Sequence, residues 1–253
     1  MSESPKTAWI TGGGTGIGRA LALRLARAGW RVAISGRRPE PLEDTAAAAA
    51  GLDGEILALP ADVTDADSVR AAVASIHERF GPIGLAVMNA GMFKPLKLRD
   101  FNTASFEAHF NVNVLGAVRG IEAVLPDMLD RGGRIVLVAS VAGYRGLPTA
   151  GPYGATKAAL INLAETLHME LGRRKVQVSV VNPGFVETPL TEKNRFPMPA
   201  LITPEVAAER MYAGILSGRF ETTFPRRFTW FLKFLRCLPY ALYFPLIKKA
   251  TLK

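Results

Sequence analysis

Thr11-Gly12-Gly13-Gly14-Thr15-Gly16-Ile17-Gly18 is preceded by a short apolar segment, residues 7–10, and followed by Arg19-Ala20-Leu21-Ala22, which has the periodicity of a helix. Glycines between a strand and a helix let the backbone take up positive φ angles and approach a bound group closely. The amides and the dipole of the following helix N-terminus attract phosphate groups. The stretch lacks the Lys-Ser or Lys-Thr pair of a P-loop, and its spacing, T-G-x-x-x-G-x-G, differs from G-x-G-x-x-G. It is a candidate dinucleotide-binding loop, and a flexible turn without a ligand is the alternative.

The alternation of strand and helix continues along the chain. Short apolar segments rich in β-branched residues predict strands at residues 7–10, 31–35, 55–59, 85–88, 134–139 and 176–181. Helical periodicity predicts helices at residues 17–28, 41–50, 66–80, 103–129, 152–172 and 204–217. Strands that are apolar on both faces belong to sheets covered on two sides. We therefore predict an α/β fold with a Rossmann-type, doubly wound parallel sheet in a single domain.

Two parts of the chain differ in composition. The 253 residues are 49% hydrophobic and 21% charged, as in an ordinary globular protein with a large core. The net charge of +9 is concentrated in residues 219–253, which hold eight basic residues and one acidic residue. Residues 1–218, the predicted dinucleotide-binding and catalytic domain, are nearly neutral, which argues against nucleic acid as a partner. Residues 219–253 are predicted to form a last strand at 221–224 and a basic, aromatic C-terminal extension.

The end of the second predicted strand bears on which dinucleotide is bound. In Rossmann folds an acidic residue at this place hydrogen-bonds the ribose of NAD. Here the chain reads Ala33-Ile34-Ser35-Gly36-Arg37-Arg38, without a carboxylate. Guanidinium groups match phosphate oxygens in geometry and charge, so Arg37 and Arg38 favour NADP, with NAD as the alternative. The other interpretation is that both arginines only cover a solvated loop.

Tyr153 and Lys157 are separated by four residues at the start of a predicted helix, so they lie on one face of it. A nearby ammonium group stabilises a phenolate, and a helix N-terminus acts in the same direction. By itself such a pair is most often a surface contact. Ser140, however, follows the fifth predicted strand, and the strand ends of open α/β sheets face the ligand crevice. The three residues are therefore candidates for a catalytic group beside the glycine loop.

Over residues 6–217, the chain resembles the short-chain dehydrogenase/reductase family, in the branch whose subunits have about this length. The motifs that carry the resemblance occur in the family's order. They are the T-G-x-x-x-G-I-G stretch at 11–18, Asp62, Asn89-Ala90-Gly91, Asn113, Ser140, Tyr153 with Lys157, Asn182-Pro183-Gly184, and Thr188.

The resemblance implies a role for each matching residue. Tyr153 would be the general acid or base, Ser140 would hold the substrate oxygen, and Lys157 would depress the pKa of Tyr153 and bind the nicotinamide ribose. Asn113 would maintain a proton-relay water near Lys157. The implied cofactor-binding set is Gly12, Gly14, Thr15, Gly16, Ile17, Gly18, Arg37, Arg38, Asp62, Val63, Asn89, Ala90, Gly91, Tyr153, Lys157, Pro183, Gly184, Val186 and Thr188. Within it, Asp62 would meet the adenine, Asn89 and Gly91 the ribose, and Thr188 the carboxamide.

Several of these residues also have structural interpretations. Asn89 and Asn113 would then satisfy buried backbone groups, and Asp62 would cap the helix that begins near residue 65. The three histidines stand on separate predicted helices without ligand spacing, so we expect no metal site.

The C-terminal extension allows two interpretations. Aromatic residues beside cations at residues 226–249 are typical of a helix on an anionic membrane surface, whereas Lys233, Arg236 and two prolines disfavour a membrane span. A lid or a subunit contact packed on the domain is the alternative. The segment 190–203, which contains Phe196, Pro197, Met198, Pro199 and Leu201, is expected to cover the substrate pocket and favours a hydrophobic substrate.

Together these features predict an NADP-dependent oxidoreductase that interconverts a carbonyl and an alcohol on a hydrophobic small molecule. A cofactor-sensing or scaffold protein at a membrane surface, or an epimerase on the same fold, is the alternative. The single Cys237 cannot form an intrachain disulfide, and no apolar segment of signal-peptide length opens the chain. We therefore expect a cytoplasmic protein, and homo-oligomers are common among enzymes of this kind.

Overall fold

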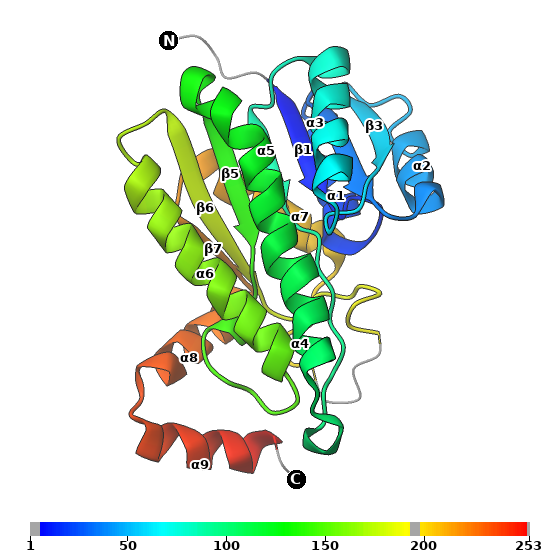
Figure 1. The fold of residues 1–253 in the computed structure, drawn as a ribbon. Coiled ribbons are helices and arrows are strands. Elements are labelled where there is room, and N and C mark those ends of the chain that lie inside the picture. The colour runs from blue at the N-terminus through cyan, green and yellow to red at the C-terminus, as the bar shows by residue number, and fades with distance from the viewer. Residues whose placement is uncertain (1–5, 193–197, 252–253) are drawn as a thin grey trace.

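A seven-stranded parallel sheet forms the centre of the molecule (Figure 1). The computed structural model describes residues 6–192 and 198–251. The strand order is β3-β2-β1-β4-β5-β6-β7, and every neighbouring pair is parallel. The strands are β1 (Thr7–Thr11), β2 (Arg31–Gly36), β3 (Glu55–Pro60), β4 (Leu85–Met88), β5 (Gly133–Val138), β6 (Val176–Pro183) and β7 (Glu221–Phe224). This confirms the predicted Rossmann-type parallel sheet.

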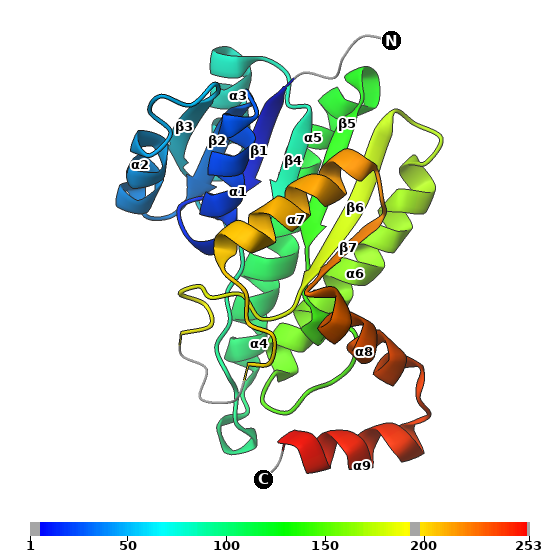
Figure 2. The same ribbon diagram turned by 180° about the vertical axis from the view of Figure 1, so that it is seen from behind.

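Helices cover both faces of the sheet, as the two views in Figures 1 and 2 show. One face packs against α3 (Ala66–Phe80), α5 (Gly116–Arg131) and α6 (Gly151–Leu171). The other face packs against α1 (Gly16–Arg27), α2 (Pro39–Ala47) and α7 (Pro204–Ser217). The remaining helices are α4 (Thr103–Phe110), α8 (Arg226–Cys237) and α9 (Tyr240–Thr251), with short helical turns at Leu98–Asp100 and Val141–Gly143.

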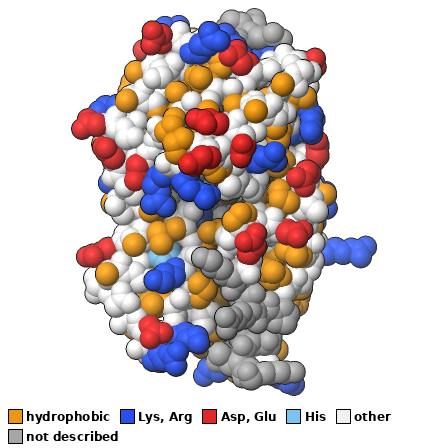
Figure 3. All heavy atoms as spheres, turned by 90° about the vertical axis from the view of Figure 1, so that its right-hand side faces the viewer, with side chains coloured by type: hydrophobic (Ala, Val, Ile, Leu, Met, Phe, Trp, Pro, Cys, Tyr) orange, Lys and Arg blue, Asp and Glu red, His pale blue; other side chains and the backbone are white. Residues whose placement is uncertain are grey.

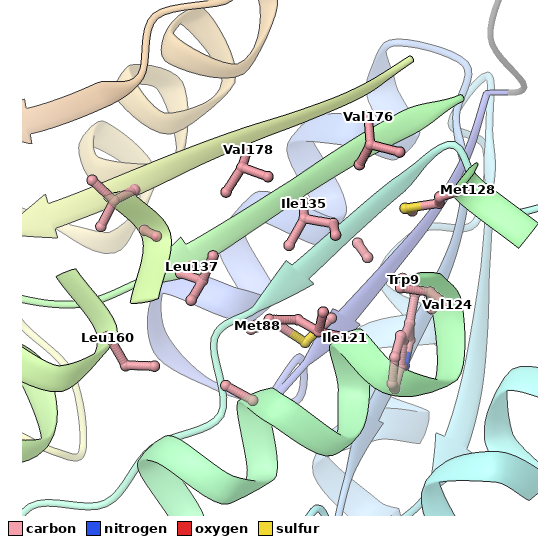
Figure 4. Close-up of a cluster of buried hydrophobic side chains, with 14 of the residues drawn as sticks. Trp9, Met88, Ile121, Val124, Met128, Ile135, Leu137, Leu160, Val176 and Val178 are labelled. Atoms are coloured by element: carbon pink, nitrogen blue, oxygen red, sulfur yellow. The ribbon is translucent and has the colours of Figure 1, made fainter. Parts of the chain in front are cut away.

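The core is divided between the two faces of the sheet because successive side chains of a strand point in opposite directions. In β1, Trp9 belongs to the cluster under α3, α5 and α6, whereas Ala8 and Ile10 belong to the cluster under α1 and α7. Figure 4 shows Trp9 beside side chains of α5. Burying one large apolar side chain contributes roughly 1.5–3 kcal/mol, so each strand needs a covering helix on both sides.

The predicted helix at residues 103–129 is instead two helices joined by a π-helical turn. α4 ends at Phe110, the turn spans Asn111–Leu115, and α5 begins at Gly116. The apolar periodicity crosses all three parts, so the sequence pattern does not reveal the wider turn. Single π-helical turns often occur at functional sites, and this one holds Asn113.

Charged side chains of both signs are mixed on the face shown in Figure 3, in agreement with the near-neutral composition of the main body.

The C-terminal extension forms the helices α8 and α9, separated at Leu238-Pro239. A residue that precedes proline is disfavoured in the α region, and Leu238 is extended. Among the described residues, no helix is both long enough and apolar enough to cross a membrane.

The order of the strands positions the site. β1 lies between β2 and β4, so the connections that leave β1 and β4 run to opposite faces of the sheet. Ligands of open α/β sheets bind in the crevice at such a switch point, beyond the carboxyl ends of the strands. The glycine loop follows β1 there, and Asn89-Ala90-Gly91 follows β4.

Candidate active site

The glycine loop between β1 and α1 is shaped by three positions that exclude a side chain. Gly12 has φ +68° and Gly16 has φ +54°, angles that L-residues with side chains rarely adopt. A Cβ on Gly18 would lie 2.2 Å from the carbonyl oxygen of Gly12, which is closer than atoms can approach. Apart from Thr15, the loop therefore presents backbone without side chains before the N-terminus of α1. This bare cradle fits the pyrophosphate of a dinucleotide.

Asn89 holds the glycine loop in place from the neighbouring strand. Its Nδ2 donates to the carbonyl oxygens of Thr11 and Gly12, each at 3.0 Å. The hydroxyl of Thr11 accepts hydrogen bonds from the amides of Asn89 and Ala90, also at 3.0 Å. Asn89 thus satisfies backbone groups of the loop, and its contact with the cofactor ribose stays a prediction. Sequence reasoning quoted Thr11 only as part of the motif and missed its role in joining the two loops.

Arg37 and Arg38 follow β2, as predicted, and both are exposed. Neither forms an ion pair within residues 6–192 and 198–251. The strand before them has no acidic side chain, and the hydroxyl of Ser35 is occupied by a hydrogen bond from Trp9 Nε1 at 3.1 Å. Two guanidinium groups thus stand at the place where Rossmann folds bind the adenosine ribose.

Asp62, after β3, does not cap the following helix. The side chain of Asp65 accepts a hydrogen bond from the amide of Asp67 and caps α3 instead, so the capping interpretation of Asp62 is wrong. Asp62 Oδ1 accepts hydrogen bonds from the amide and the hydroxyl of Thr64, at 2.9 and 2.8 Å. Burial alone would raise the pKa of Asp62, but these hydrogen bonds and the charge of Arg37 outweigh it and lower the pKa.

Val63, next to Asp62, is buried against the start of α5. A Cβ on Gly116 would lie 2.8 Å from Val63 Cγ2, so the two elements are in close contact there. The guanidinium of Arg119 donates to the carbonyl oxygen of Val63 at 3.1 Å. This packing fixes the segment after β3 beside the glycine-loop end of the sheet.

Ser140, Tyr153 and Lys157 meet at the carboxyl end of β5. Ser140 Oγ accepts a hydrogen bond from the amide of Ala142 at 3.1 Å and donates to Pro183 O at 3.5 Å. It also lies near enough to the Tyr153 phenol to act on its pKa. Tyr153 lies in the first turn of α6. Lys157, one turn later, has its Nζ 5.5 Å from the centroid of the Tyr153 ring, and the Nζ donates to Val138 O at 2.9 Å. The spacing of four residues thus produces the predicted proximity.

The pKa shifts of the pair differ from the expectation. Burial raises the pKa of Tyr153 to about 12, and Ser140 acts in the opposite direction without reversing the shift. Burial also lowers the pKa of Lys157 to about 8. The expected depression of the Tyr153 pKa by Lys157 is therefore absent, because desolvation disfavours the charged form of both groups. A phenol that keeps its proton at neutral pH is suited to donate it.

Phe93 adds an apolar wall that sequence reasoning missed. Its ring meets the ring of Tyr153 edge to face, with the centroids 4.9 Å apart. Phe93 lies only two residues beyond Gly91 of the Asn89-Ala90-Gly91 motif. That closeness in sequence was the one feature that could have indicated a place beside the site. The ring helps to exclude water from one side of the phenol.

Asn113 is completely buried in the π-helical turn and holds the segment after β4. Its Oδ1 accepts from the amide of Met92 at 2.7 Å, and its Nδ2 donates to Met92 O at 3.1 Å and to Thr156 Oγ1 at 2.9 Å. The structural interpretation of Asn113 is thus correct. A Cβ on Gly91 would lie 3.5 Å from Asn113 Oδ1 and 3.6 Å from Lys157 Nζ, so both polar atoms border the same space. The relay role stays a prediction.

The chain beyond β6 lies across the glycine loop. A Cβ on Gly16 would lie 3.0 Å from Thr188 Cγ2, so Thr188 touches the glycine loop. Val186 is buried and forms an isolated parallel bridge with Ile202. This bridge brings the two ends of the intervening segment together beside the site.

Pro183 ends β6, and the amide of Gly184 donates to Phe224 O at 2.7 Å. Residues 190–192 and 198–203 of the predicted pocket-covering segment are described, and Leu201 is exposed. Phe196 and Pro197 lie outside the described residues. Coverage of a substrate pocket by this segment stays a prediction.

Comparisons with known proteins agree with this geometry. A family model described as short chain dehydrogenase matches residues 6–198. The 3-oxoacyl-[acyl-carrier-protein] reductase of Thermotoga maritima is 35% identical over 87% of this chain and 86% of its own. A Thermococcus sibiricus alcohol dehydrogenase, complexed with 5-hydroxy-NADP, has a TM-score of 0.78 at 28% identity and covers 86% of this chain and 95% of its own. A Burkholderia phymatum short chain dehydrogenase/reductase in complex with NAD has a TM-score of 0.83 at 25% identity, with coverages of 92% and 93%.

The matched region contains the glycine loop, the ends of the strands β1 to β6 and the Ser140-Tyr153-Lys157 group. The relatives include enzymes named for the reduction of a carbonyl and for the oxidation of an alcohol, and solved structures with NADP-type and NAD cofactors. The protein is accordingly an oxidoreductase that uses NAD(P) to act on CH–OH or C=O groups. By sequence, fold and site geometry, the chain belongs to the short-chain dehydrogenase/reductase family.

Proposed function

We propose that the protein interconverts a carbonyl and an alcohol on a hydrophobic small molecule with NADP(H), using Tyr153 as general acid and base. The observation that carries this proposal is the convergence of Ser140, Tyr153 and Lys157 at the carboxyl end of β5, with Lys157 Nζ 5.5 Å from the centroid of the Tyr153 ring. This group lies at the same end of the sheet as the bare glycine cradle.

Each residue has a distinct task in carbonyl reduction. Tyr153 donates its phenolic proton to the substrate oxygen, and Ser140 Oγ holds that oxygen through a hydrogen bond. Lys157 binds ribose hydroxyls and supplies positive charge near the phenol when it is protonated. Bound NADP(H) supplies the hydride in this direction and accepts it in the other. Proton transfer by a positioned group contributes roughly 10²- to 10⁴-fold, so the tyrosine is an essential but partial contributor.

Replacing Tyr153 with phenylalanine tests the catalytic assignment. We expect wild type to oxidise NADPH with a panel of hydrophobic ketones and 3-oxoacyl thioesters, and Tyr153→Phe to lose at least 100-fold in kcat/KM. Nucleotide binding, measured by quenching of tryptophan fluorescence, should stay within about twofold because the aromatic ring is retained. Tyr212→Phe, on the opposite face of the sheet, is the matched control. Equal rates for wild type and Tyr153→Phe would exclude Tyr153 as the proton donor.

Preference for NADP over NAD rests on the two exposed guanidinium groups at the end of β2. A charge-assisted hydrogen bond to a phosphate contributes about 1.5–3 kcal/mol, which corresponds to roughly a 10- to 100-fold change in Kd. Arg37→Ala should therefore weaken NADPH binding at least tenfold and NADH binding less than twofold. Arg173→Ala, also exposed but remote from β2, is the control. Unchanged selectivity in Arg37→Ala would sink the phosphate assignment.

A hydrophobic substrate is supported by Phe93 against Tyr153 and by the apolar residues of the segment 190–203. Comparing kcat/KM across ketones of increasing chain length tests this assignment, and a preference for charged or polyhydroxylated substrates would contradict it.

Assembly as a homo-oligomer and residence in the cytoplasm stay predictions. Light scattering on purified protein and cell fractionation measure them directly.

A further inference from the structure

The two C-terminal helices are attached to the domain by their inner sides. Lys233 of α8 pairs with Glu221 of β7. The hydroxyl of Tyr243, on α9, donates to the carbonyl oxygen of Gly146 at 2.9 Å, and Tyr243 is buried. Figures 1 and 2 both place α8 and α9 beyond the carboxyl ends of the strands, at the end of the molecule that holds the site.

Arg145 joins the two helices to the segment that leads into α6. Its Nη1 lies 2.6 Å from the carbonyl oxygen of Leu238 and 3.2 Å from that of Leu235, at the C-terminus of α8. The guanidinium also lies over the rings of Tyr240 and Tyr243, 4.7 and 4.1 Å from their centroids. These contacts fix the orientation of the helices relative to the chain between Ser140 and Tyr153.

Both helices expose large apolar side chains. Trp230 is 70% exposed, Phe231 57% and Phe234 63%, and their spacing places them on one face of α8. On α9, Tyr240 and Phe244 are exposed on the side of the helix that carries the Arg145 contact, and Leu242 and Leu246 are exposed on the opposite side. Soluble proteins rarely expose so many large apolar groups on neighbouring helices unless the surface meets a partner.

The charges on this surface indicate what it meets. Residues 226–249 contain no acidic side chain and six basic ones, which are Arg226, Arg227, Lys233, Arg236, Lys248 and Lys249. Pairing this surface with itself in a second copy would bring cations of the same sign together and leave them unpaired. Cations beside aromatic side chains instead match the anionic headgroups and the apolar interior at the edge of a lipid bilayer.

A groove beside α8 continues the basic surface. It has a volume of about 1020 Å³ and lies between α7, β7 and α8. Trp230 and five cations line it, namely Arg210, Arg219, Arg226, Arg227 and Lys233, while its one acidic side chain, Glu221, is already paired with Lys233. The groove therefore offers unpaired positive charge to phosphate groups next to an exposed aromatic ring.

We propose that the exposed apolar and basic side chains of α8 and α9 dock the protein on the surface of an anionic lipid bilayer. The aromatic and leucine side chains enter the interfacial layer, and the surrounding lysines and arginines contact lipid phosphates. The anchoring of both helices on the 144–150 segment, which connects Ser140 to the helix of Tyr153, turns the active-site end of the molecule toward the membrane.

Sedimentation with vesicles tests the proposal independently of catalysis. The full-length protein should sediment with phosphatidylcholine vesicles that contain 30% phosphatidylglycerol, and binding should weaken as salt rises from 50 to 500 mM. The double variant Phe234→Glu, Phe244→Glu should bind at least tenfold more weakly. Met169→Glu, an equally exposed apolar site on α6, should bind like wild type. Circular dichroism and nucleotide binding verify that the variants are folded.

Tryptophan fluorescence and molecular mass distinguish a membrane-binding surface from a contact between copies of the protein. Trp230 emission should shift to the blue on vesicle binding, and Trp230→Phe should remove that shift while it retains binding. The proposal is overturned if no vesicle sediments the protein, or if the double variant binds as well as wild type. If the double variant binds vesicles like wild type but has a lower molecular mass than wild type by light scattering, the surface is a contact between copies. That result also overturns the proposal.

Discussion

At the scale of single residues, burial governs the acid–base pair more than proximity does. Tyr153 and Lys157 share a helix face, as their spacing predicts, yet each resists its charged form because it is removed from water. The phenol is consequently kept as a proton donor. Ser140 is the neighbour that acts in the opposite direction and lowers the pKa of Tyr153, without reversing the effect of burial.

The pH dependence of carbonyl reduction should reflect these two groups separately. Tyr153, with a pKa of about 12, stays protonated and should cause no break in the profile between pH 6 and 10. Lys157, with a pKa of about 8, loses its positive charge as pH rises through that value, so kcat/KM should decrease above pH 8. Ultraviolet titration at 295 nm of wild type and Tyr153→Phe measures directly whether Tyr153 stays protonated in this pH range. A phenolate signal that belongs to Tyr153 below pH 9 would contradict it.

At the scale of elements, β7 is tied to its neighbours through Glu221. Tyr144 OH and Asn182 Nδ2 donate to Glu221 Oε1 at 2.6 and 2.8 Å, and Lys233 pairs with the other oxygen. Burial would raise the pKa of Glu221, but the hydrogen bonds from Lys233, Tyr144 and Asn182 outweigh it and lower the pKa. One carboxylate therefore joins β6, β7, α8 and the turn after Ser140.

Replacing Glu221 with glutamine should destabilise the protein in a pH-dependent way. The glutamine side chain has the shape of the glutamate but carries no charge, and its NH₂ group can donate but not accept a hydrogen bond beside Lys233. We therefore expect the free energy of unfolding to fall by roughly 1–3 kcal/mol at pH 7, or the Tm to fall by about 2–8 °C. Because the folded pKa is depressed, the stabilisation is present above the usual glutamate pKa of about 4.3 and is lost as pH falls below it. Thermal unfolding of both proteins from pH 7 to 3 should show the Tm difference shrinking. A constant difference would contradict the charge argument.

At the scale of the whole molecule, the parallel sheet collects residues that are distant in sequence. Thr11, Asn89, Ser140 and Pro183 follow or end four different strands, and all lie at one end of the sheet. The same end carries the C-terminal helices, attached through Arg145 and Tyr243. The active site and the extension are thereby parts of one arrangement.

Arg145→Ala should loosen the C-terminal helices without unfolding the domain. It removes hydrogen bonds to the end of α8 and the cation–π contacts with two tyrosines of α9. Hydrogen exchange in residues 240–249 should accelerate at least tenfold, while exchange in β1, β4 and β5 stays unchanged. Arg99→Ala, at an exposed site whose arginine pairs with the adjacent Asp100, is the control. Unaltered exchange in α9 would show that Arg145 does not hold it.

The linear order of residues was sufficient to predict the strands, most of the helices, the glycine loop and the shared helix face of Tyr153 and Lys157, because periodicity, glycine and i, i+4 spacing act over a few neighbouring residues. Only the tertiary structure decided what depends on burial and on distant partners. It placed Asp65 rather than Asp62 at the helix cap, directed Asn89 and Asn113 toward backbone groups, opened a π-helical turn at Asn113, and reversed the expected pKa shift of Tyr153. Desolvation and hydrogen-bond geometry arise when separate elements pack together, and no local pattern of residues encodes them.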